Sequence, residues 1–131
     1  MSITIDGGAG ITFPDNVQQT NGMTMTGGAP LYYAARAWVN FNGATGAIRA
    51  AVNVSSVTRT ATGRYTINFS TAMPDANYCV VATSSWTAAS TNVASMSVNQ
   101  TTVPTTTQVR LRANVTSTDE DPDFCNVVIF R

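Results

Sequence analysis

The sequence contains no lysine and no histidine, and Glu120 is its only glutamate. Without histidine the chain has no Ser–His–Asp triad, no imidazole general base and no histidine ligand for a metal. Without lysine it has no Schiff-base nucleophile and no phosphate-binding P-loop. We therefore expect a protein that is not an enzyme, with no catalytic residues, no cofactor and no metal ion.

Charge is also scarce, because charged residues make up only 11% of the 131 positions and seven arginines balance seven acids. This composition does not form the basic surface that binds a polyanion, so we expect no nucleic-acid partner. No apolar run approaches the roughly 18 residues of a membrane span, and the N-terminus lacks the pattern of a signal peptide. We expect no membrane insertion and a binding or structural role.

Alternation of apolar and polar residues dominates what is present. Tyr65, Ile67 and Phe69 alternate with polar residues across 64–70, and 107–116 repeats the pattern. The segment 48–54 alternates too, which predicts one strand with Ile48 and Val52 on its core face. Further strands are predicted at 31–42, 77–84, 93–98 and 124–130, with turn signals at 42–46, 61–63, 73–77 and 119–123. About seven short strands predict an all-β fold, an antiparallel β-sandwich or barrel spanning 30–131.

The first 29 residues have a different composition. They hold six of the nine glycines and few apolar residues, so they cannot form a core of their own. We predict an extended glycine-rich N-terminal arm over 1–29.

Three of the predicted strands are apolar on both faces. In 31–42 the odd positions form a core face, yet Tyr32, Ala34 and Trp38 on the other face are apolar as well. The segments 77–84 and 124–131 share this feature, and strands that are apolar on both faces are normally buried on both. A small lone core is marginally stable, so we predict that a second copy of the chain covers the extra face. The alternative is that a loop or the arm of the same chain covers it.

The chain resembles a domain that recurs in the tail fibres and virion surface proteins of tailed bacteriophages. The resemblance is carried by residues 29–43 (APLYYAARAWVNFNG), 48–50 (IRA), 53–58 (NVSSVT), 63–69 (GRYTINF), 72–78 (AMPDANY) and 127–131 (VVIFR), and upstream by 10–15 (GITFPD) and 18–20 (QQT). It implies a non-enzymatic virion structural protein, a homotrimer with a β-structured knob, on the virion surface and assembled in the host cytoplasm. It also implies an arm that docks on tail or capsid proteins.

Two sets of contact residues are expected. The strands that are apolar on both faces supply the candidates for the trimer interface or core, which are Tyr32, Tyr33, Trp38, Phe41 and Phe130. In the arm, Ile11, Phe13 and Pro14 are the candidates for virion docking. Long fibres carry an anchoring domain and a shaft, whereas only a short arm precedes the knob here. A short trimeric fibre for host attachment suits this length, and so does a fibre-like capsid decoration protein. A carbohydrate-binding β-sandwich module is the third alternative.

Two polar loops are candidates for contact with a host cell-surface glycan. Trp86 follows two serines and precedes Thr87, and a large aromatic residue on a loop is a reasonable contact. The uncharged loop 99–107, with Asn99 and Thr101, offers amides and hydroxyls that suit sugar hydroxyls. The alternative is that the first loop covers the core and the second is only solvated.

The acidic run 119–123 and the two cysteines are the candidates for a metal or redox site. Asp119, Glu120, Asp121 and Asp123 lack the spacing of an EF-hand, so a solvated hairpin turn is expected in preference to a calcium site. Cys79 and Cys125 fit no zinc spacing. In the reducing cytoplasm that the resemblance implies, both are expected to be small buried hydrophobic residues without a disulfide.

Overall fold

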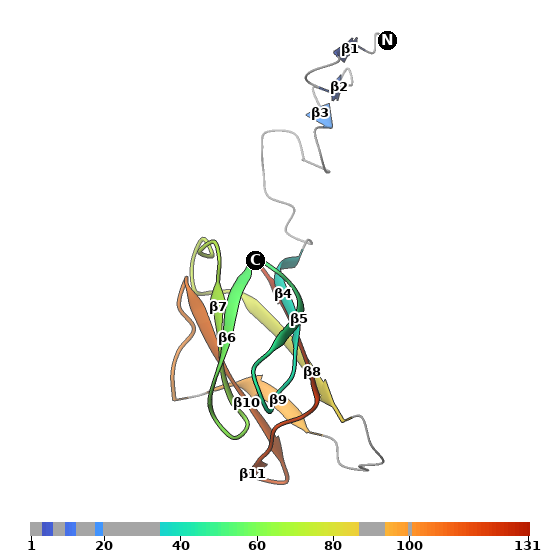
Figure 1. The fold of residues 1–131 in the computed structure, drawn as a ribbon. Helices are drawn as coiled ribbons and strands as arrows, with labels where there is room; N and C mark the ends of the chain where they lie inside the picture. The colour runs from blue at the N-terminus through green and yellow to red at the C-terminus, as the bar shows by residue number, and fades with distance from the viewer. Residues whose placement is uncertain (1–3, 7–9, 13–17, 20–34, 87–93, 100) are drawn as a thin grey trace. The chain divides into compact units, whose positions relative to one another are not determined.

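The computed structural model describes residues 4–6, 10–12, 18–19, 35–86, 94–99 and 101–131, and it divides the chain into the units Met1–Ala34 and Ala35–Arg131. In the first unit, strands β1 (Thr4–Asp6), β2 (Gly10–Thr12) and β3 (Gln18–Gln19) form an antiparallel sheet in that order (Figure 1). These three strands lie in the segment that was predicted to be an extended arm. The predicted boundary between 29 and 30 lies outside the described residues.

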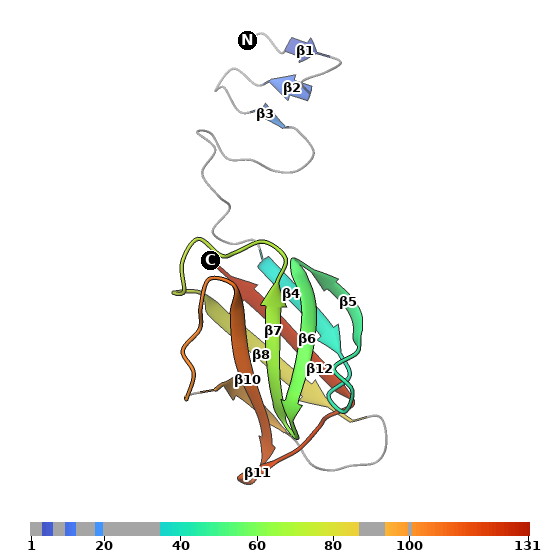
Figure 2. The ribbon, with the colours of Figure 1, turned by 60° about the vertical axis from the view of Figure 1, so that its left-hand side comes forward.

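In its described residues the second unit is an antiparallel β-sandwich of nine strands, which confirms the predicted fold class. One sheet has the order β5-β4-β12-β8, and the other has the order β11-β10-β7-β6 with β9 also paired to β10. The two sheets lie face to face (Figure 2). Their strands are β4 (Ala35–Phe41), β5 (Ile48–Val52), β6 (Val54–Ala61), β7 (Arg64–Phe69), β8 (Cys79–Ser85), β9 (Ser95–Val98), β10 (Gln108–Val115), β11 (Thr118–Asp119) and β12 (Phe124–Phe130).

The core lies between the sheets and is built from alternate residues of each central strand. Val39 on β4 pairs with Val127 on β12, and Ile67 on β7 pairs with Val109 on β10, all of them buried. Phe41 meets Tyr65 of the opposite sheet edge to face, with ring centroids 5.1 Å apart. This interdigitation is what holds two antiparallel sheets together. The described residues contain no helix of the length and apolarity that a membrane span requires.

The single strand predicted for 48–54 is wrong in its extent and its face. Asn53 has a φ of 55°, which ends β5 and starts β6 as a separate strand. Ala51 is the β5 residue that packs against the core, because it lies opposite Val39. Ile48 and Val52, predicted for the core face, are 37% and 50% exposed.

Strand β6 was not predicted, because its sequence VSSVTRTA is mostly polar. Among the described strands it is an edge strand of its sheet, paired with β7 alone, and Val54 and Val57 are its residues packed against the core. An edge strand with one covered face needs few apolar residues, so its alternation is weak. In the strand predicted for 31–42, β4 begins at Ala35, and residues 31–34 lie outside the described residues.

Candidate functional site

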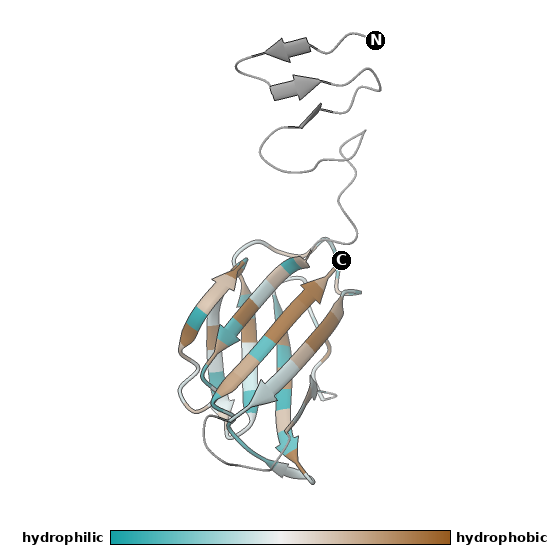
Figure 3. Cartoon of the chain, turned by 90° about the vertical axis from the view of Figure 1, so that its right-hand side faces the viewer, coloured by the Kyte–Doolittle hydropathy of each residue, from teal (hydrophilic) through white to brown (hydrophobic). Residues whose placement is uncertain are grey.

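The outer face of the β5-β4-β12-β8 sheet carries an uninterrupted row of apolar side chains. Val52, Trp38, Val128 and Val81 are direct neighbours across the four strands. Trp38 is 37% exposed, and Val52 and Val81 are each 50% exposed. Figure 3 faces this sheet, and hydrophobic segments recur on each of its strands. We call these four residues the apolar row.

The apolar row arises because the strands that are apolar on both faces lie next to each other. Strands β4, β12 and β8 are neighbours, so their second faces merge into one surface. Phe130 and Cys79 extend this surface. They pair with each other across β12 and β8, two residues along each strand from the pair of Val128 and Val81. Large apolar side chains grouped on an exposed sheet face are typical of an interaction surface.

Polar groups border the apolar row on the same face. Two residues along each strand from Trp38 and Val128, Asn40 lies opposite Asn126 and donates a hydrogen bond of 2.5 Å from Nδ2 to Oδ1. Further along, the Arg49 guanidinium lies 4.2 Å from the centre of the Phe124 ring and donates to the carbonyl oxygen of Asp123. The face therefore has an apolar centre with a polar margin, which is the arrangement found in protein interfaces.

The structure separates the residues that were predicted for a trimer interface or core. Trp38 belongs to the exposed face, and Phe130 is half-buried beside it. Phe41 is fully buried in the core. Tyr32 and Tyr33 lie outside the described residues. Val52, Val81 and Val128 were not predicted as contact residues.

The outer face of the other sheet is polar and carries a groove of about 280 Å³. Arg64 and Arg112 are direct neighbours on β7 and β10, and Ser97 on β9 lies next to Arg112. These three line the groove together with Val98, Asn99, Thr101 and Asn114. We call this site the arginine groove. Asn99 and Thr101, predicted as sugar contacts, therefore lie in one hollow with two arginines.

A single carboxylate positions the two guanidinium groups of the arginine groove. Nε of Arg64 lies 2.8 Å from Oδ2 of Asp119, and Nε of Arg112 lies 2.5 Å from its Oδ1. The hydrogen bonds from Arg112 and then Arg64 outweigh desolvation and lower the pKa of Asp119 below its ordinary value of 3.8. Two positive charges face one negative charge, so the groove remains cationic.

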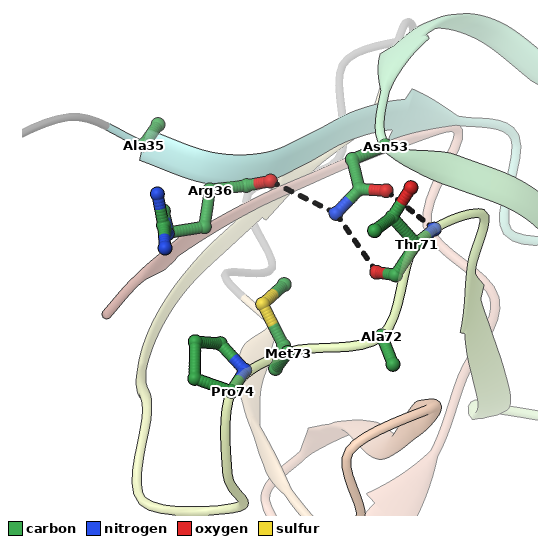
Figure 4. Close-up of a pocket in the computed structure, with 7 residues that line it drawn as sticks. All are labelled: Ala35, Arg36, Asn53, Thr71, Ala72, Met73 and Pro74. Carbon is green, nitrogen blue, oxygen red and sulfur yellow. Dashed lines mark hydrogen bonds between the residues drawn. The ribbon is translucent and has the colours of Figure 1, made fainter. Parts of the chain in front are cut away.

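A second hollow, of about 360 Å³, lies where β4, β5 and the loop after β7 meet (Figure 4). Its central polar group is Asn53, whose Nδ2 donates to the carbonyl oxygens of Arg36 and Thr71 and whose Oδ1 accepts from the Thr71 amide. These bonds engage both amide atoms and hold the left-handed backbone of Asn53 in place. This hollow is a structural joint with little capacity left for a ligand.

The prediction that 119–123 forms a solvated turn is wrong. Asp121 has a side chain only 15% exposed, and Oδ1 accepts hydrogen bonds of 2.8 Å from both the Tyr65 hydroxyl and the Gly63 amide. Its Oδ2 is paired with Arg59 at 2.5 Å. Pro122 is fully buried as well. The run is an ion-paired anchor, and in the described part of the chain no group of acidic or cysteine side chains is placed to hold a metal ion.

The expectation that both cysteines are buried holds for only one of them. Both thiols are free, and Cys125 is buried, whereas Cys79 is exposed. Cys125 lies on the core face of β12, and Cys79 lies beside Phe130 on the outer side of β8. Cys79 is exposed because it lies two residues before Val81 on β8, and alternate residues of a strand share one face.

Of the other residues predicted to contact a receptor or the virion, the structure describes Trp86 and Ile11. Trp86 follows β8 and is half-buried, but it does not line the arginine groove. Thr87, Phe13 and Pro14 lie outside the described residues. Ile11 has its backbone in β2, opposite Ile5 and Gln19. The roles of these residues in receptor contact and virion docking stay predictions.

No protein family, curated protein or solved structure matches this chain. The candidate functional sites are therefore the two outer faces of the sandwich, one with an apolar row and one with an arginine groove.

Proposed function

We propose that the chain is a subunit of a homotrimeric, non-enzymatic bacteriophage virion surface protein, a short fibre-type protein that takes part in host attachment. The observation that carries the proposal is the apolar row of Val52, Trp38, Val128 and Val81, exposed on one sheet face. The resemblance to tail-fibre domains supplies the class of protein and the number of copies.

Self-association is the simplest way to cover this face. Covering a half-exposed valine such as Val52 or Val81 contributes about 1 kcal/mol, and Trp38 adds a large apolar area. In an assembly of identical subunits each chain presents the same row, so the gain is repeated in every copy. The polar margin at Asn40 and Asn126 then lies at the rim of the contact.

Light scattering of the full-length protein in solution tests the proposal directly. The expected mass is three times the 13.8 kDa of one chain. Val81→Asp places a charge at the β8 end of the apolar row and is expected to give monomers, because three buried like charges repel one another. Val103→Asp is the matched control, since Val103 is 78% exposed and lies outside the row.

Circular dichroism establishes that both variants keep their β structure, so that loss of assembly is not confused with unfolding. A monomer of 13.8 kDa for the unsubstituted protein at micromolar concentration would contradict the proposal. So would a Val81→Asp variant that is folded and still trimeric.

Binding assays with the same protein separate the two virion roles. An attachment protein binds host cells, whereas a decoration protein binds empty capsids and raises their resistance to heat. We expect binding to cells. Binding to capsids alone would replace attachment by decoration and leave the trimer in place.

A further inference from the structure

The arginine groove has several hydrogen-bond donors that the fold itself does not use. Asp119 holds both guanidinium groups by Nε, so that no partner is found for either Nη of Arg64 or for Nη1 of Arg112 among the described residues. Within that same part of the chain the Asn114 side chain and the Ser97 hydroxyl make no hydrogen bond either. The groove therefore presents more donors than acceptors and suits a ligand rich in acceptor oxygens.

Two of the residues that line the groove, Asn99 and Thr101, hold each other in place. Asn99 Oδ1 accepts hydrogen bonds from the amide and the hydroxyl of Thr101, at 3.0 and 2.7 Å. This turn leaves Nδ2 of Asn99 as a further donor at the groove. Nearby, Arg110 donates to the Thr102 hydroxyl, at 3.4 Å, which ties the same loop to β10.

The size and chemistry of the groove limit the ligand. A volume of about 280 Å³ admits one small ring rather than an extended chain. A guanidinium binds a carboxylate through two parallel hydrogen bonds, whereas amides and hydroxyls bind sugar hydroxyls. Among the residues that the structure describes, no aromatic side chain lines the groove, so a neutral sugar would lack the ring stacking that usually holds it.

We propose that the arginine groove binds the carboxylate-bearing ring of an acidic sugar. The carboxylate lies against the free Nη atoms of Arg64 and Arg112, and the ring hydroxyls bind Asn99, Asn114 and Ser97. The site lies on the sheet opposite the apolar row, so it does not depend on the proposed trimer.

The proposal is tested by nuclear magnetic resonance, with glucuronate added to the ¹⁵N-labelled full-length protein. We expect the amide signals of Ser97, Asn99, Thr101 and Asn114 to shift, with a dissociation constant on the order of 1 mM for a single ring. Glucose, acetate and inorganic phosphate are the comparison ligands. Each is expected to bind at least tenfold more weakly than glucuronate. Glucose lacks the carboxylate, and acetate and phosphate lack the ring with its hydroxyls.

Two substitutions in the groove and one matched control complete the test. Arg112→Gln is expected to weaken glucuronate binding about tenfold, since a charge-assisted pair is lost. Asn114→Ala removes an amide that holds nothing else in the described structure, so it keeps the fold even if Arg112→Gln does not. It is expected to weaken binding about fivefold. Arg36→Gln removes the same charge from the opposite sheet and is expected to leave binding unchanged.

Two results would overturn the proposal. The first is that glucuronate shifts no amide signal of the groove, or shifts these signals no more than acetate or phosphate does. The groove would then be at most a site for simple anions. The other is a folded Asn114→Ala variant that binds glucuronate as well as the unsubstituted protein. Because the measurement is made on the groove signals, a protein that proves monomeric does not affect it.

Discussion

Asp121 joins the segment before β12 to the β6–β7 hairpin, which is distant from it in the sequence. Its carboxylate accepts from the Gly63 amide in the turn after β6, from the Tyr65 hydroxyl on β7 and from Arg59 on β6. Burial alone would raise the pKa of Asp121, but these hydrogen bonds outweigh it and hold the pKa below 3.8. The side chain is therefore ionised at neutral pH, with each oxygen satisfied.

We predict that Asp121→Ala lowers the free energy of unfolding by about 3 kcal/mol, because Arg59, Gly63 and Tyr65 lose their shared acceptor in a mostly buried place. Urea unfolding followed by tryptophan fluorescence measures the change. Glu120→Ala is the matched control, since the described structure gives its side chain no hydrogen bond. It is expected to change stability by less than about 0.5 kcal/mol. Equal losses in the two variants would contradict the anchoring role.

At the scale of the element, the turn between β6 and β7 requires a glycine at position 63. Gly63 has a φ of 63°, and an added Cβ would lie 2.9 Å from the Glu120 nitrogen and even closer to the Ala113 carbonyl oxygen. Both atoms belong to backbone that is fixed by the hydrogen bonds Ala113 N to Gly63 O and Glu120 N to Ala113 O. A side chain here forces the turn and the β10–β11 hairpin apart.

Gly63→Ala is therefore predicted to destabilise the sandwich by about 3 kcal/mol, of which roughly 1 kcal/mol is left-handed backbone strain and the rest is the clash. Gly46 is the control, because its φ of 73° imposes the same strain, while its added Cβ comes no closer than 3.0 Å to another atom. Gly46→Ala is expected to cost about 1 kcal/mol. Thermal unfolding of both variants checks the difference, and equal losses would refute the clash.

The same scale explains what could be predicted from the sequence. Alternation in 64–70 and 107–116 is a local property of the chain, and both segments form central strands, β7 and β10. In 48–54 the phase with Ile48 and Val52 is the more apolar one, so alternation alone favoured the wrong face. Pairing with β4 decides the face, because Ala51 lies opposite the buried Val39.

The candidate sites divide in the same way. The exposed apolar face could be predicted in part, since Trp38 lies on a strand that is apolar on both sides. The arginine groove could not, because Arg64 and Arg112 become neighbours only through the register of β7 with β10. In the sequence, Arg64 and Arg112 each lie beside a core residue, Tyr65 or Leu111. This pattern is typical of any polar residue on the outer face of a strand.

At the scale of the whole molecule the titratable groups divide into two sets. A hydrogen bond with Arg131 lowers the pKa of Asp75, and Asp119 and Asp121 are lowered by their own arginine partners. Burial raises the pKa of Tyr78 and of Cys125 to about 12 each, and it also raises the pKa of Tyr65, helped by the hydrogen bond to Asp121. The chain has no histidine, so no side chain has an ordinary pKa between these two sets.

Stability is therefore predicted to be constant from about pH 5 to pH 8 and to fall on both sides of this range. The carboxyls with lowered pKa values stabilise the fold above their unfolded value of 3.8, and this contribution is lost as the pH falls further. The tyrosines and Cys125 ionise more readily when unfolded, with ordinary values of 10.0 and 9.0, so stability is lost as the pH rises through and above these values. Urea midpoints measured between pH 2 and pH 11 test the profile. In Asp121→Ala the acid limb is expected to be shallower, because one of the carboxyls responsible is gone. A stability that changes steadily between pH 5 and pH 8 would show that some other group controls the fold.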